Sequence, residues 1–98
     1  MVLGDLLVSE SKNWLLQLQA DGDLVLKSTG GLVMWRSGTA GVGARVEMLW
    51  NGDFVVFDKA DSIVFQTNTS GHTAAYSILH DIGVLAVYWR GALLWSSS

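Results

Sequence analysis

An internal repeat of about 30 residues constrains this chain more than any other feature. Residues 14–39 align with residues 44–69 without a gap, and a third, one residue shorter copy follows in residues 74–98. Two landmarks recur in all three copies: a turn glycine, at Gly22, Gly52 and Gly83, and an aromatic residue, at Trp35, Phe65 and Trp95. A period of this length indicates a supersecondary unit that buries its apolar face against its neighbours.

Each copy has the alternating pattern of half-buried β-strands. In the first copy, Trp14, Leu16 and Leu18 alternate with Leu15, Gln17 and Gln19. The dipeptides Asp21-Gly22 and Asn51-Gly52 predict hairpins with type I′ turns, whose two central residues both need positive φ. A second turn follows in each copy, and we expect the one near Arg90-Gly91 to be tighter, because the third copy is one residue shorter.

The predicted architecture is all-β. No segment has apolar residues at helical spacing for long enough to compete. We expect three small antiparallel sheets of about three or four strands each, in one domain, residues 1–98, with repeats at about 10–39, 40–70 and 71–98. The recurring Trp35, Phe65 and Trp95 are predicted to form the core that the sheets share.

Composition argues against several classes of function. The net charge is −3 and the six Lys and Arg residues form no run, so we expect no nucleic-acid partner. No apolar run approaches the length of a membrane span, and "MVLGDLLVSESK" lacks the pattern of a signal peptide. The chain has no Cys and hence no disulfide, which leaves its localisation open. His72 and His80 have no metal-ligand spacing, and no catalytic motif is present, so we expect no enzyme activity, metal or cofactor.

One stretch, "QADGDLVLK", carries the pattern of a binding site. It places Gln19, Asp21, Asp23, Val25 and Lys27 at alternate positions, so that their side chains point to the same side of an extended chain. Such a row of acceptors and donors is either the polar end of a hairpin or a hydrogen-bonding site for a ligand.

With "VMWRSGT" following it, this stretch resembles the repeat of the bulb-type mannose-binding lectins, which have the β-prism II fold. That family carries the motif Gln-x-Asp-x-Asn-x-Val-x-Tyr once per repeat, followed by a Trp-x-Ser/Thr segment. The resemblance implies three sheets in a pseudo-threefold arrangement. It also implies that each intact motif binds one mannose, with polar side chains bonded to hydroxyls and Val packed against the carbon face. It further implies a homodimer that exchanges the C-terminal strand, in the stretch "ALLWSSS"; the alternative is that this strand folds back to complete the prism of its own chain.

The three motifs differ in how much of the pattern remains. The first keeps Gln19, Asp21 and Val25, but Asp23 replaces Asn and Lys27 replaces Tyr. Asp23 thus adds a second carboxylate near Asp21, which Lys27 could balance. The second motif is degenerate and reads Leu49, Asn51, Asp53, Val55 and Phe57. The third is also degenerate and reads His80, Ile82, Val84, Ala86 and Tyr88, or in an alternative register uses Asp81.

The sequence is therefore compatible with two candidate functions. The first is a lectin for mannose or mannose-rich glycans with at most one well-preserved site, formed by the first motif. The second is a β-prism scaffold that has lost sugar binding and acts through protein–protein contacts, with a designed or reconstructed prism as a variant of it.

Overall fold

The computed structural model describes residues 1–98 and consists of strands and turns without any helix, and so without a helix that could cross a membrane. The ten strands are β1 (Leu6–Val8), β2 (Trp14–Leu18), β3 (Leu24–Ser28), β4 (Val33–Arg36), β5 (Arg45–Met48), β6 (Phe54–Phe57), β7 (Ile63–Gln66), β8 (Tyr76–His80), β9 (Val84–Trp89) and β10 (Ala92–Ser96).

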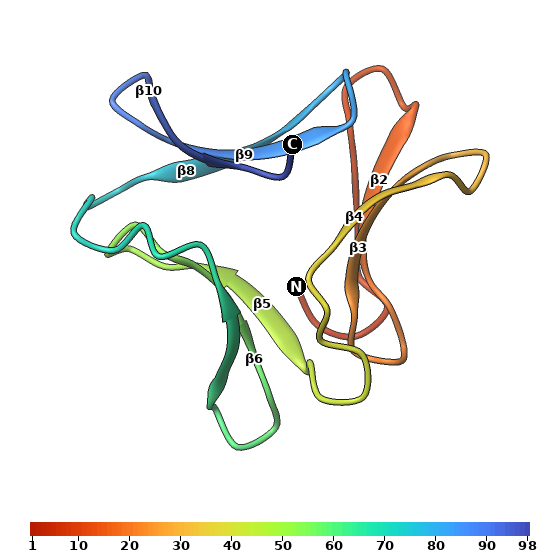
Figure 1. Ribbon diagram of the computed structural model, residues 1–98, viewed down its shortest axis with the longest axis horizontal. Helices are drawn as coiled ribbons and strands as arrows, with labels where there is room; N and C mark the ends of the chain where they lie inside the picture. The colour runs from red at the N-terminus through yellow and green to blue at the C-terminus, as the bar shows by residue number, and fades with distance from the viewer.

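The strands form three antiparallel sheets that surround a common axis like the sides of a triangle (Figure 1). The first sheet has the order β1-β2-β3-β4, the second β5-β6-β7 and the third β10-β9-β8. The structure therefore confirms the predicted all-β fold with three sheets of three or four strands. It adds β1, which precedes the first predicted repeat and pairs with β2.

The hairpin turns lie where the glycines predict them, but the first two do not have the predicted type I′ geometry. The N–H of Gly22 donates to the carbonyl of Gln19 (2.9 Å), and only Gly22 has positive φ (91°). This is a type I turn followed by a glycine in the left-handed region, so the predicted type I′ turn is wrong here, as it is at Gly52. A two-residue turn with positive φ at both positions occurs instead at Arg90-Gly91 (50° and 81°), which confirms the expected tighter turn.

A bulge in each sheet turns the recurring aromatic residue inward. The strand register shifts immediately before Trp35, Phe65 and Trp95 in the same way in all three sheets. Trp35 then lies opposite Leu26, and residues directly opposite each other point to the same face. The three rings meet edge to face at centroid distances of 5.5, 5.5 and 6.2 Å, as predicted, but they are half-buried and pack against the fully buried core rather than forming it.

The central strands β3, β6 and β9 separate core and surface residues by alternation. In β3, Leu24 and Leu26 belong to the central core, whereas Val25 between them faces outward. The same alternation holds in β6 and β9. The buried core consists of Leu16, Leu18, Leu24, Leu26, Val46, Phe54, Val56, Ala75, Leu85 and Val87. The side chains on the outer faces of the sheets can therefore vary without repacking this core.

Both ends of the chain are tied into the sheets. The C-terminal strand β10 pairs with β9 of its own chain, and the N–H of Ser97 donates to the carbonyl of Leu85 (2.8 Å). At the other end, the amino group of Met1 donates to the carbonyl of Val46 (2.7 Å), and Val2 forms a β-bridge with Arg45. The first eight residues therefore connect the second sheet to the first.

Candidate functional site

The outer face of the first sheet carries the best-preserved motif. Val25 lies between Gln17 of β2 and Arg36 of β4, its partners across the sheet. Gln19 and Lys27 are half-buried, and neither side chain forms a hydrogen bond or ion pair within the protein. Their donors and acceptors are therefore free for a ligand. Val25 is only 2% exposed and contributes little open apolar surface.

Asp21 is exposed at the tip of the β2–β3 hairpin. Its Oδ1 accepts a hydrogen bond from the backbone N–H of Asp23 (2.9 Å), and Asn51 does the same for Asp53 in the second copy (2.9 Å). This bond shapes the turn. No protein group donates to Oδ2 of Asp21, which leaves one carboxylate oxygen open to a ligand.

Asp23, by contrast, is buried (3% exposed) and anchors the segment that closes the repeat. Its Oδ1 accepts hydrogen bonds from the Ser37 hydroxyl (3.1 Å) and from the backbone N–H groups of Gly38 (3.0 Å) and Thr39 (3.2 Å). The cation within 4.0 Å of its Oδ2 is Arg36, rather than the Lys27 that the sequence suggested. Asp23 therefore serves mainly to anchor the segment that follows β4.

The second copy repeats this anchor, which sequence reasoning missed. Asp53 is buried and accepts hydrogen bonds from the Thr67 hydroxyl (3.2 Å) and the Thr69 backbone N–H (3.4 Å). In both copies the partners lie 14 and 16 residues after the Asp. This shared spacing is the signal in the sequence that could have revealed the anchor.

A cation covers the Phe57 end of the outer face of the second sheet. The guanidinium of Arg45 lies 4.1 Å from the ring centroid of Phe57, the residue at the motif's Tyr position. Arg45 is held there by hydrogen bonds to Asp61 and to Glu47 (3.1 Å). These bonds, that to Asp61 above all, raise the pKa of Arg45 above its ordinary value. A sugar at this end of the face would have to displace a bonded guanidinium.

Asp81, the alternative residue of the third motif, connects two sheets. Its Oδ1 accepts a hydrogen bond from the N–H of Ser11 (2.8 Å), and its carbonyl accepts one from the indole N–H of Trp14 (2.7 Å). The hydrogen bond from Ser11 lowers the pKa of the Asp81 carboxyl. The Trp14 ring also packs on Gly83, where a Cβ would approach it to 2.9 Å. Asp81 therefore belongs to the contact between the third and first sheets.

Tyr88, the other residue of the third motif, is engaged by its neighbours. Its hydroxyl shares a hydrogen bond with Nε2 of His80 (2.8 Å), and its ring stacks on Tyr76 with centroids 5.9 Å apart. The third face thus presents an aromatic cluster rather than a row of free amides and carboxylates.

Comparison with known proteins identifies the fold and the family. No protein-family model and no curated protein matches the chain. Among solved structures, the monomeric mannose-binding lectins of Gastrodia elata share the fold, with a TM-score of 0.86 and 24% identity over 100% of this chain and 89% of theirs. The Polygonatum cyrtonema lectin, solved with a monomannoside, gives 0.78 and 27% over 89% of this chain and 80% of that one.

A third structure is more similar in sequence. The domain-swapped lectin dimer of Mycobacterium smegmatis is 31% identical over 100% of this chain and 92% of its own, with a TM-score of 0.57. Three antiparallel sheets, each with a turn glycine and an inward aromatic residue, define a β-prism II domain of the lectin type. The chain belongs to the bulb-type mannose-binding lectin family.

Proposed function

We propose that residues 1–98 form a single lectin domain that binds mannose or mannose-rich glycans through the outer face of the first sheet. The observation that carries this proposal is a set of free polar groups on that face: the Gln19 amide and the Asp21 Oδ2 at the hairpin end, and the Lys27 ammonium in β3, four residues after Asp23. Family membership and the monomannoside complex of the Polygonatum cyrtonema lectin support it. We infer a binding module that needs no cofactor and catalyses no reaction.

The three free groups match the hydrogen-bonding needs of a sugar. Vicinal hydroxyls both donate and accept, so an amide can satisfy one pair while a carboxylate accepts and an ammonium donates. Asp23 supports this site from behind, since it fixes the hairpin end to the closing segment. A shallow site with these few contacts binds weakly and benefits from multivalent ligands.

The substitution Asp21→Asn tests the proposal without disturbing the turn. Its amide oxygen keeps the bond to the Asp23 N–H, as Asn51 does in the second copy, but the free carboxylate oxygen is lost. We expect calorimetry with methyl α-mannoside to show an affinity about tenfold or more lower, the effect of one hydrogen bond to a charged group. The matched control Asn51→Asp leaves the affinity unchanged, because the second motif has Leu49 in place of Gln and Arg45 covers its Phe57.

Two outcomes would contradict sugar binding at this face. The first is the absence of heat with both the mannoside and a mannose-terminated oligosaccharide, and the second is unchanged affinity in Asp21→Asn. The covered Phe57 and the engaged Tyr88 favour the scaffold as the second candidate function. A blank glycan array, together with a protein partner recovered in pull-downs, would favour that scaffold function.

We also propose a homodimer formed by exchange of β10, as an extension of the lectin proposal. The Mycobacterium smegmatis relative is a domain-swapped dimer, and exchange would reproduce between two chains the β9–β10 pairing that one chain makes here. Light scattering is expected to give twice the chain mass of 10.6 kDa. A mass near 10.6 kDa at micromolar concentration would contradict the dimer.

A further inference from the structure

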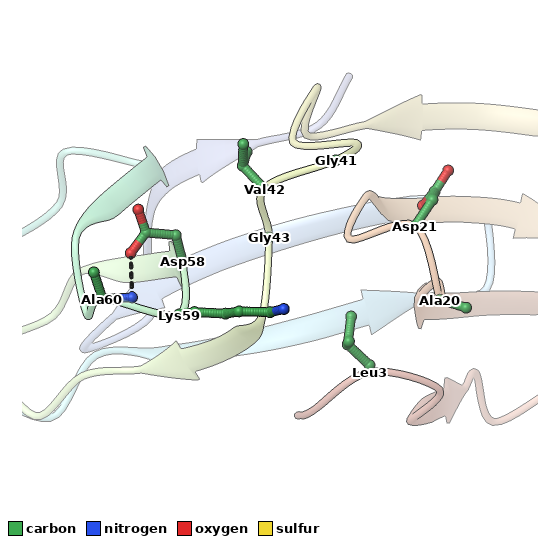
Figure 2. Close-up of a pocket in the computed structure, with 9 residues that line it drawn as sticks. All are labelled: Leu3, Ala20, Asp21, Gly41, Val42, Gly43, Asp58, Lys59 and Ala60. Carbon is green, nitrogen blue, oxygen red and sulfur yellow. Dashed lines mark hydrogen bonds between the residues drawn. The ribbon is translucent and has the colours of Figure 1, made fainter.

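An open pocket of about 530 Å³ lies beside the hairpin that carries Asp21 (Figure 2). Four separate segments line it: Leu3 near the N-terminus, Ala20-Asp21 at the hairpin tip, the loop Gly41–Gly43 and the turn Asp58–Ala60 of the second sheet. Its volume falls in the range of about 300–1,000 Å³ that is usual for ligand sites. Of the motif positions, only Asp21 belongs to its lining.

Backbone contacts fix the walls of this pocket. The N–H of Gly41 donates to the carbonyl of Asp21, and a Cβ on Gly43 would lie 1.9 Å from the carbonyl oxygen of Gly22. On the opposite wall, Oδ1 of Asp58 accepts hydrogen bonds from the N–H groups of Ala60 and Ser62 (2.9 Å each). The pocket is therefore formed before any ligand arrives.

The pocket offers the same kinds of group as the motif. Asp21 lies on the pocket wall and has one carboxylate oxygen without a protein donor, and the Lys59 ammonium has no carboxylate within 4.0 Å. In Figure 2 the Lys59 side chain extends across the pocket between the Gly41–Gly43 loop and Leu3. The exposed Leu3 and Val42 side chains add apolar surface for C–H groups. An acceptor, a donor and apolar surface together suit a polyhydroxylated ring.

We infer that this pocket is a second subsite, which holds the next residue of a mannose-containing oligosaccharide whose first residue lies at Gln19. The inference rests on the proposed function, and Asp21 links the two subsites because it belongs to both the motif and the pocket wall. Lys59 donates to hydroxyls of the second residue, and Leu3 and Val42 cover its carbon face. The preferred ligand is therefore at least a disaccharide.

The test compares methyl α-mannoside with an α-linked mannotriose by calorimetry. We expect the wild-type chain to bind the mannotriose about five- to tenfold more tightly, the gain that roughly one net hydrogen bond provides. Lys59→Met, which removes the ammonium, and Ala60→Trp, which fills the pocket, abolish this gain and leave mannoside affinity unchanged. The control Ala92→Trp, at an exposed alanine of β10 outside the pocket, keeps the gain.

The outcomes separate the inference from the proposed function. Equal affinity of the wild-type chain for both sugars, or a gain that survives in Lys59→Met and Ala60→Trp, overturns the subsite while sugar binding stands. No binding of either sugar overturns the proposed function and the subsite with it. Amide NMR signals of Val42 and Ala60 that shift with mannotriose but not with the mannoside would support the subsite directly.

Discussion

The Trp35→Ala protein is expected to lose about 3 kcal/mol of unfolding free energy, the lower end of the usual cost of truncating a large aromatic residue, because Trp35 is half-buried and packs against the core. Trp35 contacts both Phe65 and Trp95 edge to face, so the truncation opens a cavity at the axis where all three sheets meet. The total stability of a small domain is only about 5–15 kcal/mol. Denaturant titration followed by circular dichroism measures the loss.

A matched tryptophan provides the control. Trp50 is 75% exposed, and we expect Trp50→Ala to change the unfolding free energy by no more than about 0.5 kcal/mol. Trp35→Phe keeps an aromatic ring beside Phe65 and Trp95. We expect its loss of unfolding free energy to lie between those of Trp35→Ala and Trp50→Ala. Equal stabilities of Trp35→Ala and Trp50→Ala would contradict the central role of the three rings.

The second large effect is expected for Asp23→Ala, at about 2–4 kcal/mol of unfolding free energy, since it leaves buried donors without an acceptor. The carboxylate oxygen that accepts from Ser37, Gly38 and Thr39 disappears, and the segment after β4 loses its anchor. Hydrogen exchange monitored by NMR should show reduced protection of the Gly38 and Thr39 amides. Thermal unfolding gives the overall loss.

Asp23→Asn separates the acceptor from the charge. The amide oxygen of Asn can accept the same hydrogen bonds, so we expect this variant to remain within about 1 kcal/mol of the wild-type chain. Asp53→Ala should behave like Asp23→Ala, because its anchor in the second sheet is equivalent. If Asp23→Ala and Asp23→Asn proved equally unstable, the charge beside Arg36 rather than the acceptor would be what matters.

The sequence predicts the sheets well because the repeat places equivalent residues in equivalent environments. The spacing of Trp35, Phe65 and Trp95 correctly predicts that the three rings meet. The type I′ prediction fails because Asp21 and Asn51 bond through their side chains to the N–H two residues later and so keep negative φ. The same dipeptide pattern is compatible with both turns, and the side-chain bond selects the one observed.

The site is harder to predict because alternation says which way a side chain points, not which bonds it makes. Gln19 and Lys27 lie on the outer face with free polar groups, as the pattern suggests. Asp23 belongs to the same series of alternate positions, yet its Oδ1 accepts hydrogen bonds from Ser37 and Thr39, which lie 14 and 16 residues later in the chain. The position of the Arg45 guanidinium over Phe57 likewise depends on its hydrogen bond to Asp61. Asp61 lies in a turn, and the periodicity of the strands does not predict where a turn residue points.

The alternation along each central strand has a consequence for valency. Leu24 and Leu26 of β3 belong to the core, while Val25 between them points to the outer face, and β6 and β9 repeat this division. Each face can therefore gain or lose a ligand through changes on one side of its strands, without repacking the other. The number of binding sites on a fold of this kind is thus set face by face, whereas its stability is set by all three sheets together.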